Sequence, residues 1–243
     1  MDSTSIQAYE TSARVAAYDA DMDLMHPNRQ NMVEVMMAVL AASAPAPRLA
    51  IDLGTGTGFL LERLLRRFPD CRAVAIDGSQ QMVAAAKSRL GTLAERVEFV
   101  LGDFRRPDAF GQEIASANTV ISAFALHHLD LHEKSRLIGH CRTLLKDGGW
   151  FLNADIVVAE DEFLEALVQR MRVSGIVDRS HGQDPRFRDA AGTRRFLDEL
   201  ERNDCDRPQK LADDLRTVQE CGYRHVTLLW KDTREVVYGG VRR

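Results

Sequence analysis

The stretch LAIDLGTGTGFL, residues Leu49–Leu60, decides the fold of this chain. Its first five residues form a mostly apolar run that is suited to a central parallel strand. Gly54, Gly56 and Gly58 follow at once, and glycines let a chain turn tightly and let its backbone approach a ligand closely. A segment that could begin a helix comes next. This order of strand, glycine-rich turn and helix is typical of a pocket for a nucleotide-type cofactor.

The spacing of the glycines narrows the choice of cofactor. The dinucleotide fingerprint has the pattern G-x-G-x-x-G, whose third glycine packs the helix on the strand. This chain has G-x-G-x-G from Gly54 to Gly58, so pyrophosphate binding is disfavoured. Because a glycine-rich strand exit can also be a purely structural turn, the following segments have to decide.

Apolar runs that predict further strands recur along the chain, over residues 73–76, 97–101, 119–122 and 150–156. Asp77 ends the second strand, where an acid typically binds the hydroxyl pair of a ribose. Asp103 and Phe104 follow the third strand, where they could hold an adenine amino group and cover its ring. The alternation of strands with helices predicts an α/β fold with a doubly wound sheet.

The motifs IDLGTGTG, LGDF and LLKDGGWF, with Asp77 between the first two, stand in the order seen in class I S-adenosylmethionine-dependent methyltransferases. The sequence resembles that superfamily most strongly over residues 30–160, and its small-molecule members in particular. The tail CGYRHVTLLWKDTREVVYGGVR resembles the end of the last helix and the antiparallel hairpin of the same fold. The resemblance implies a seven-stranded sheet of order 3-2-1-4-5-7-6 whose last strand is antiparallel.

A chain of 243 residues is long enough for one large α/β domain. Residues 1–243 are therefore expected to form a single methyltransferase domain in four parts. These parts are an N-terminal helical cap (1–45), a cofactor-binding core (46–158), a helical lid or substrate insertion (159–207), and the last helix with the C-terminal hairpin (208–243). Within the insertion, a helix is predicted from about Asp161 to Ile176 and a polar loop from Val177 to Gly192.

The amino-acid composition limits which partners and which cellular compartment are expected for the protein. The formal net charge of -4 gives no broad basic field, so nucleic acid is a weak candidate partner. The four cysteines show no C-x-x-C or other metal-ligand spacing, which is typical of reduced thiols in the cytoplasm. Neither a signal-peptide pattern nor an apolar run of about 18 residues is present. We therefore expect a cytoplasmic protein without a membrane partner, and a homodimer is compatible with the sequence.

The resemblance also implies S-adenosyl-L-methionine as the cofactor and assigns residues to it. Asp52 and the glycines of the first turn would surround its methionine part. Asp77 would bind its ribose, and Asp103 with Phe104 its adenine. Tyr18, from the N-terminal helices, would face the methyl group, and Arg29 would reach the cofactor carboxylate. The residues expected around the cofactor are Asp52, Gly54, Thr55, Gly56, Gly58, Asp77, Gly78, Met82, Gly102, Asp103, Phe104, Ser122, Ala123, Arg29 and Tyr18.

Methyl transfer requires little chemical activation by the protein, because a sulfonium methyl group is already electrophilic. Positioning can contribute roughly 7 to 11 kcal/mol, and a general base about 10²- to 10⁴-fold when the nucleophile carries a proton. His127 and His128 follow the fourth strand and are candidates for that base. Asp155, at the end of the fifth strand, is the next candidate, and its alternative role is to stabilise the N-terminus of a following helix. His181 in the polar loop is the third candidate.

The polar loop predicts an acidic small molecule as one class of methyl acceptor. Its arginines Arg179, Arg186 and Arg188 could clamp a carboxylate or a phosphate, because a guanidinium offers a forked donor. They could equally belong to an ordinary solvated surface of mixed charge.

A metal site is a weaker interpretation of the same region. Imidazoles and carboxylates bind several divalent ions, and His26, His127, His128, Asp155 and His181 could converge in space. No pair spaced as H-x-x-x-H on one helix face stands among these five residues, so we predict no metal.

Our interpretation is S-adenosylmethionine-dependent methyl transfer to an oxygen, nitrogen or carbon nucleophile of a small molecule. The fourth-strand exit SAFALHHLD lacks the Asn/Asp-Pro-Pro-Tyr run of similar enzymes that methylate amino groups of nucleobases or glutamine, which disfavours those acceptors. Three alternatives remain open: a tRNA wobble-uridine or carboxylated-cofactor enzyme of the same fold, a NAD-dependent oxidoreductase, and a non-catalytic cofactor-binding protein.

Overall fold

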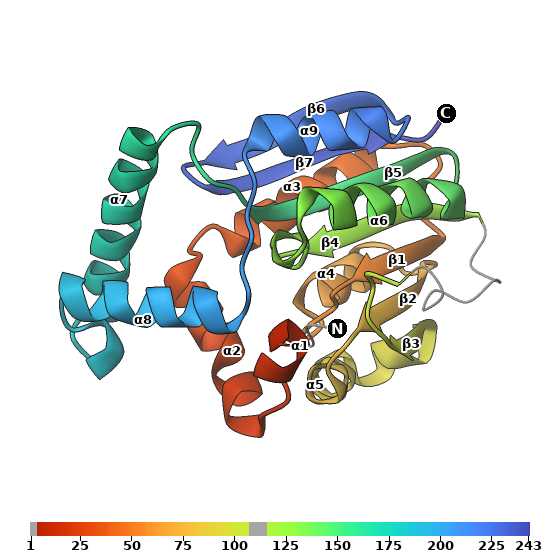
Figure 1. Cartoon of the computed structure of the whole chain (residues 1–243). Helices are drawn as coiled ribbons and strands as arrows, with labels where there is room; N and C mark the ends of the chain where they lie inside the picture. Colours follow the sequence, from red (N-terminus) through yellow and green to blue (C-terminus); the bar gives the residue numbers. More distant parts are fainter. Residues whose placement is uncertain (1–3, 107–115) are drawn as a thin grey trace.

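The computed structural model describes residues 4–106 and 116–243, and one mixed β-sheet runs through the middle of this part of the chain (Figure 1). Its strand order is β3-β2-β1-β4-β5-β7-β6. The described strands are β1 (Leu49–Leu53), β2 (Arg72–Asp77), β3 (Val97–Leu101), β4 (Ala117–Ala123), β5 (Leu145–Ile156), β6 (Arg224–Asp232) and β7 (Glu235–Val241). Strands β1 to β5 are parallel, and β7 is antiparallel to both β5 and β6. The predicted strand order and the antiparallel last strand are confirmed.

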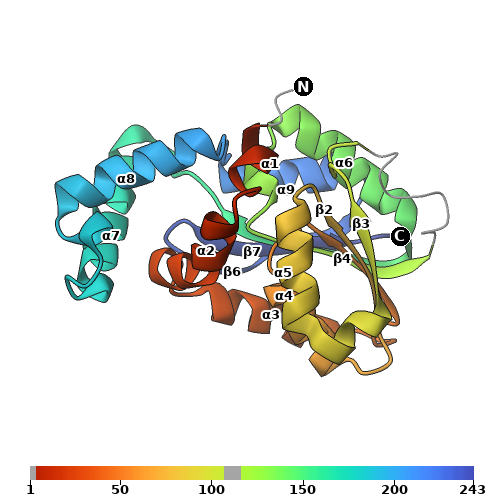
Figure 2. The ribbon, with the colours of Figure 1, turned by 90° about the horizontal axis from the view of Figure 1, so that it is seen from below.

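Helices cover both faces of the sheet (Figure 2). The described α-helices are α1 (Thr4–Ala8), α2 (Ser12–Met25), α3 (Arg29–Ala42), α4 (Phe59–Arg67), α5 (Gln80–Leu90), α6 (Leu131–Leu144), α7 (Glu162–Ser180), α8 (Ala190–Asn203) and α9 (Leu211–Glu220), and the 3-10 turns are η1 (Gly91–Arg96), η3 (Leu126–His128) and η4 (Pro185–Phe187). Met36 of α3 and Leu61 of α4 belong to one buried cluster, whereas Leu137 of α6 and Val218 of α9 belong to another. The sheet is therefore buried on both faces, as apolar parallel strands require. In the described ranges, no helix has the length and apolar character needed to cross a membrane.

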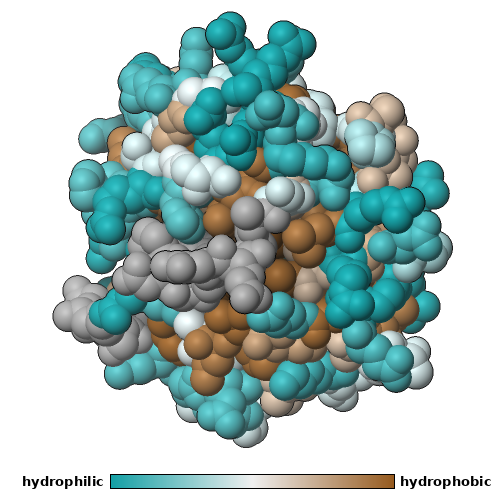
Figure 3. Space-filling model, turned by 90° about the vertical axis from the view of Figure 1, so that its right-hand side faces the viewer, coloured by the Kyte–Doolittle hydropathy of each residue, from teal (hydrophilic) through white to brown (hydrophobic). Residues whose placement is uncertain are grey.

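The N-terminal helices lie against the edge formed by the carboxyl ends of the parallel strands. The hydroxyl of Ser79, just after β2, donates a 2.8 Å hydrogen bond to the carbonyl of Tyr9, and the backbone N–H of Gln80 donates to Glu10. The strand-end residues singled out from the sequence therefore gather beneath α1 and α2. The opposite edge of the sheet belongs to the face shown in Figure 3, where hydrophilic side chains surround hydrophobic ones near the middle.

Helices α7 and α8 form an insertion that stands out beside the sheet (Figure 1). The helix predicted over residues 161–176 continues to Ser180, and α8 begins at Ala190. The polar loop predicted over Val177–Gly192 is therefore wrong, because only residues 181–189 join the two helices.

A small apolar core explains why this polar stretch is helical. Phe187 and Leu197 are fully buried and pack with Met25 in a cluster of their own. Asp189 caps α8 by accepting a hydrogen bond from the N–H of Gly192. Apolar residues at helical spacing, together with this cap, outweigh the polar composition that suggested a loop.

Candidate active site

A cleft of about 640 Å³ opens at the carboxyl ends of β1, β2 and β3. His128 lines this cleft together with Ala125 and Leu129. Of the residues predicted to surround the cofactor, the cleft walls contain Tyr18, Gly54, Gly56, Asp77, Gly78, Met82, Asp103 and Phe104.

The first glycine turn brings backbone close to this cleft. Gly54 has a φ of +68°, which is a left-handed conformation, and a Cβ atom at this position would overlap the side chain of Ala125. Gly58 has a φ of +80°, and a Cβ atom there would lie 3.2 Å from Ala86 of α5. The turn therefore requires glycine at both positions, and the side chain missing at Gly54 leaves space in the cleft.

Asp77 joins the glycine turn to the start of α5. Its carboxylate accepts hydrogen bonds from the N–H groups of Gly56 at 2.7 Å and Ser79 at 2.9 Å. Burial raises the pKa of this carboxyl, and the two backbone donors oppose the shift. The N–H of Gly102 donates to the Asp77 carbonyl at 2.9 Å. Asp77, at the end of β2, thus contacts the segments that follow β1 and β3, the strands on either side of it.

Asp103 and Phe104 lie in the cleft wall beyond the end of β3, as the sequence predicts. Both carboxylate oxygens of Asp103 accept hydrogen bonds from Nε of Arg105 at 2.9 Å. Phe104 faces the glycine turn, because a Cβ atom on Gly54 would lie 3.4 Å from its ring. The placement suits an adenine ring, and the adenine contact itself stays a prediction.

A polar recess of about 370 Å³ lies beside the glycine turn, and its walls include Arg29, Asp52 and Thr55. The Thr55 hydroxyl donates a 2.5 Å hydrogen bond to Asp52. The Arg29 guanidinium lies 2.9 Å from Asp19 and 3.9 Å from the centre of the Phe59 ring. An acid and a guanidinium in one recess suit the ammonium and the carboxylate of an α-amino acid. The residues present therefore fit the methionine part of S-adenosylmethionine.

The other residues predicted for the cofactor have different surroundings. Ala123 borders the recess. Ser122 is fully buried, and its hydroxyl donates a 2.9 Å hydrogen bond to the carbonyl of Leu53, which joins β4 to β1. In the described structure Ser122, Gly58 and Gly102 support the turns and stand outside the walls of the cleft and the recess.

We expect cofactor binding to strengthen with pH because of Asp52. Burial raises the pKa of its carboxyl to about 7, although the Thr55 hydrogen bond lowers it. Only the ionised carboxylate attracts the cofactor ammonium, so the affinity for S-adenosylhomocysteine should rise about ten-fold from pH 6 to pH 8. Titration calorimetry at both pH values checks this, and Asp52→Asn should bind equally at both. A pH dependence that persists in Asp52→Asn would assign the titration to another group.

A second cavity of about 510 Å³, called here the acceptor chamber, adjoins the cleft. Its walls are Tyr9, Arg14, Tyr18, Asp21, Met22, Met25, His26, Phe124, His127, Ile156, Arg172, Leu200, Glu201, Asp204 and Asp206. Tyr9, Tyr18 and Phe124 line both cavities and form the boundary between them. The α2 helix and the insertion thus supply much of a chamber that sits directly beside the cleft.

A buried carboxylate holds His127 at the wall of the acceptor chamber. Its Nδ1 lies 2.6 Å from Oδ1 of Asp155. Asp155 also accepts hydrogen bonds from the side chain of Asn153 at 3.2 Å and from the N–H of Ile156 at 2.9 Å. Because Asp155 lies inside β5 and α7 begins only at Glu162, the alternative role predicted for it at a helix N-terminus is wrong.

The structure keeps a proton on His127 at neutral pH. Burial by itself lowers the pKa of this imidazole, but the carboxylates of Asp155 and Asp206 outweigh that effect and raise the pKa to about 10. An imidazolium has no free lone pair that could accept a proton. The general base predicted at this position would first have to lose the proton that it holds.

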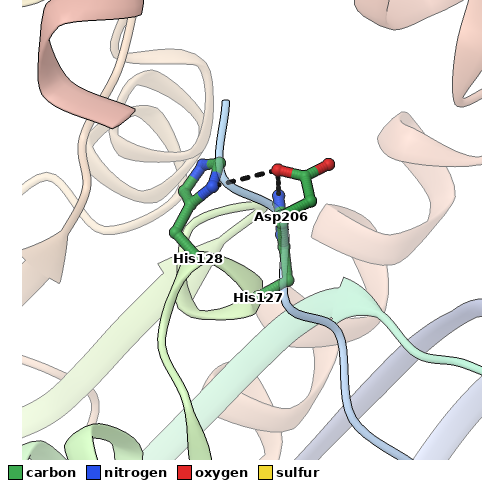
Figure 4. A group of neighbouring side chains, drawn as sticks. All are labelled: His127, His128 and Asp206. Atoms are coloured by element: carbon green, nitrogen blue, oxygen red, sulfur yellow. Dashed lines mark ion pairs between the residues drawn. The ribbon is translucent and has the colours of Figure 1, made fainter. Parts of the chain in front are cut away.

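Asp206 connects both histidines, and the sequence analysis missed it. Nε2 of His127 and Nδ1 of His128 lie 3.4 and 3.1 Å from the same Oδ1 atom of Asp206 (Figure 4). Asp206 belongs to the segment between α8 and α9. That segment is a polar linker with two acids, and nothing in the linear sequence distinguishes Asp206 from Asp204.

Four of the predicted residues do not reach either cavity in the described structure. His181 is exposed at the C-terminal cap of α7, and Arg188 is exposed as well. Arg179 donates a 2.8 Å hydrogen bond to a backbone carbonyl of α2. Arg186 donates to both oxygens of Asp21 at 3.0 and 2.6 Å, and therefore fastens the insertion to α2. These side chains face solvent or serve internal contacts, and the roles predicted for them in catalysis and substrate clamping stay predictions.

His26 borders the acceptor chamber but has its own partner. Its Nδ1 lies 3.0 Å from Glu235, and burial lowers the pKa of its imidazole. The five residues that the sequence suggested as metal ligands therefore do not converge as one group. Only His127 and His128 of those five lie together around Asp206.

Comparison with known proteins agrees with this geometry. Residues 50–149 match the family described as "Methyltransferase domain". An uncharacterized methyltransferase of Anoxybacillus flavithermus is 32% identical over 130 residues, which cover 54% of this chain and 57% of that protein. The malonyl-[acyl-carrier protein] O-methyltransferase of Halalkalibacterium halodurans is 25% identical over 175 residues, which cover 69% of this chain and 61% of that one. The chain spans about half the length of the curated relatives that it matches.

The fold comparison points the same way. The structure of an O-methyltransferase family protein from Burkholderia thailandensis has a TM-score of 0.64 at 22% identity, over 97% of this chain and 63% of that one. The fold and the site resemble those of class I S-adenosylmethionine-dependent methyltransferases. Residues 50–149 match a methyltransferase domain, and S-adenosyl-L-methionine is the cofactor that this match and the neighbouring structures with bound SAM or SAH support.

Proposed function

We propose that this chain transfers a methyl group from S-adenosylmethionine to a hydroxyl oxygen of a small uncharged molecule in the acceptor chamber. The observation that carries the proposal is the pair of adjoining cavities, which share Tyr9, Tyr18 and Phe124 as their boundary. An O-methyltransferase among the relatives supports an oxygen acceptor.

Charges around the chamber favour an uncharged acceptor over the anionic one expected from the sequence. Among the described residues, its walls hold more carboxylates than arginines, namely Asp21, Glu201, Asp204 and Asp206 against Arg14 and Arg172. Arg14 lies 2.7 Å from Asp204, and Arg172 pairs with Glu201. Each guanidinium already faces a carboxylate, so neither arginine is free to pair with an acidic substrate.

Positioning is the main contribution of the chain to the rate. S-Adenosylmethionine, when bound, supplies a methyl group on a positively charged sulfur. Tyr18 and Phe124 stand where the two cavities meet, and Tyr9 packs edge-on against Tyr18 with ring centres 5.9 Å apart. Holding two reactants in a near-attack geometry can contribute about 7 to 11 kcal/mol.

The hydroxyl proton of the acceptor has to leave near the same boundary. His128 lines the cleft, whereas His127 and Asp206 line the acceptor chamber. This group of three, called here the boundary cluster, places ionisable side chains on the walls of both cavities. We assign to it the task of making the hydroxyl oxygen nucleophilic, for which proton-transfer catalysis typically supplies about 10²- to 10⁴-fold.

Two measurements test the proposed function. Titration calorimetry should show saturable binding of S-adenosylmethionine and of S-adenosylhomocysteine. A panel of phenols, alcohols, amines and carboxylic acids should then give S-adenosylhomocysteine, detected by mass spectrometry, with members of the hydroxyl classes. Lack of cofactor binding at millimolar concentration would exclude the methyltransferase, and turnover confined to carboxylic acids would exclude the uncharged acceptor.

We expect Asp77→Asn to weaken the binding of S-adenosylhomocysteine by about 10- to 100-fold. A hydrogen bond to a charged group contributes about 1.5 to 3 kcal/mol, and Asp77 also orders Gly56 and Ser79. Calorimetry against the wild-type chain measures the change. Asp147→Asn is the matched control, because Asp147 is exposed and its ion pair with Arg242 lies at the surface. Equal affinity of Asp77→Asn and wild type would contradict the ribose role.

A further inference from the structure

We propose that the boundary cluster of His127, His128 and Asp206 binds one divalent transition-metal ion between the cleft and the acceptor chamber. The donor atoms, one nitrogen from each imidazole and one carboxylate oxygen, all lie within 4.8 Å of one another. Figure 4 shows the three side chains converging from η3 and from the segment before α9. Two imidazoles and a carboxylate form a donor set that suits zinc, iron(II), cobalt(II) and similar ions.

The separations between Asp206 and each histidine match those around a metal ion. Bonds from such ions to nitrogen and oxygen are about 2.0 to 2.2 Å long, so adjacent ligand atoms lie about 2.8 to 3.6 Å apart at octahedral or tetrahedral angles. Oδ1 of Asp206 lies 3.4 Å from Nε2 of His127 and 3.1 Å from Nδ1 of His128. These two separations therefore suit an ion, which on binding would displace the Nε2 proton of His127.

Two of these donor atoms have no hydrogen-bond partner in the described structure. Nδ1 of His128 and Oδ1 of Asp206 are buried, and neither forms a hydrogen bond although they are close. Buried polar atoms in native proteins are normally satisfied by protein, water or an ion. An ion that took the lone pairs of both atoms would satisfy them together.

The surroundings hold the cluster in place. Nδ1 of His127 lies 2.6 Å from Asp155, and a carboxylate on the far nitrogen of a histidine is the usual device that orients a metal-ligating ring. The N–H of Arg207 donates a 2.7 Å hydrogen bond to the carbonyl of His127. The residue after Asp206 is thereby fastened to η3, so the three donors meet although they come from distant parts of the chain.

The position of the ion gives it a role in the proposed function, and this part of the inference rests on that function. An acceptor hydroxyl in the chamber could take an open ligand position, and a divalent cation lowers the pKa of such a group. The O–H bond breaks and its proton passes to solvent. The electron pair of the oxygen forms the bond to the methyl carbon, while the carbon–sulfur bond breaks and its electron pair stays on sulfur.

Cobalt binding to the tag-free chain tests the site. After treatment with a chelator and its removal, Co²⁺ should bind at one ion per chain in calorimetry and should show visible absorption bands of nitrogen- and oxygen-ligated cobalt. His128→Ala and Asp206→Ala should weaken this binding more than about 100-fold, and Asp155→Asn about 10- to 100-fold. His132→Ala is the matched control, because His132 is exposed on α6 and should leave binding unchanged. Asp206→Asn replaces Asp206→Ala if the latter does not fold.

The same samples separate this inference from the proposed function. Absence of saturable Co²⁺ binding to the wild-type chain, or unchanged binding in both ligand variants, would overturn the metal site. If the chain then still bound S-adenosylhomocysteine and methylated a hydroxyl, the proposed function would stand alone. If the chain bound Co²⁺ but neither cofactor form, the metal site would stand and its role in methyl transfer would fall.

Discussion

Replacing His127 by alanine is expected to lower kcat for methyl transfer by about 10²- to 10⁴-fold, the range for losing assistance to a proton transfer. The Kd for S-adenosylhomocysteine should stay close to the wild-type value, because His127 lines the acceptor chamber and the cofactor cleft is built from other residues. Asp155 holds His127 at 2.6 Å, so Asp155→Asn should lower kcat in the same direction through a misoriented ring. Steady-state assays with the acceptor found in the panel measure kcat for both variants.

Two controls keep this result interpretable. His132→Ala removes an exposed imidazole of α6 and should keep wild-type kcat. Circular dichroism and the thermal midpoint of His127→Ala show whether the vacated space beside the buried Asp155 has disturbed the fold. A folded His127→Ala chain with wild-type kcat would remove the boundary cluster from the mechanism, and the reaction would then depend on positioning alone.

Lys134→Ala is expected to lower the free energy of unfolding by about 3 to 5 kcal/mol, the usual cost of breaking a buried ion pair. Nζ of Lys134 on α6 lies 2.8 Å from Asp214 on α9, and neither side chain is exposed to solvent. Removing the ammonium leaves a carboxylate in the interior without its counter-charge. Urea unfolding followed by circular dichroism measures the change.

Two comparisons identify burial as the cause of this loss. Lys134→Met combined with Asp214→Leu removes both charges and should recover most of the stability, because buried pairs replaced by apolar residues are often neutral or stabilising. Arg216→Ala breaks an ion pair of 3.1 Å on the outside of the same α9 helix, where Arg216 is 63% exposed, and should cost at most about 1 kcal/mol. Equal losses in Lys134→Ala and Arg216→Ala would contradict the argument.

The cofactor side of the molecule could be predicted from local sequence, because its signals lie within single strands and the turns that follow them. The apolar run at Leu49–Leu53 and the glycines after it form β1 and the turn at the cleft. Asp77 and Asp103 lie in the cleft because parallel strands bring their carboxyl ends to one edge. Strand polarity alone therefore places these residues.

The acceptor side could not be predicted in the same way, because its contacts join distant segments. Arginine is a residue type suited to clamping an acidic substrate, but the partner of Arg186 is Asp21, near the other end of the chain. Asp206 stands in a polar linker, and only the tertiary fold brings it to His127 and His128. The end of α7 and the start of α8 were predicted as part of a loop, because polar residues hide the apolar positions that pack at Phe187.

Tyr9 forms contacts at both the acceptor chamber and the cofactor cleft. Its hydroxyl donates a 2.9 Å hydrogen bond to Asp204 in the acceptor chamber, while its carbonyl accepts one from Ser79 at the cleft. A displacement of α1 that opened one cavity would break the contacts that close the other. We therefore expect release of the spent cofactor and admission of the next acceptor to share a single conformational step. The rate of that step would set an upper limit on the number of turnovers per second, however fast the chemistry is.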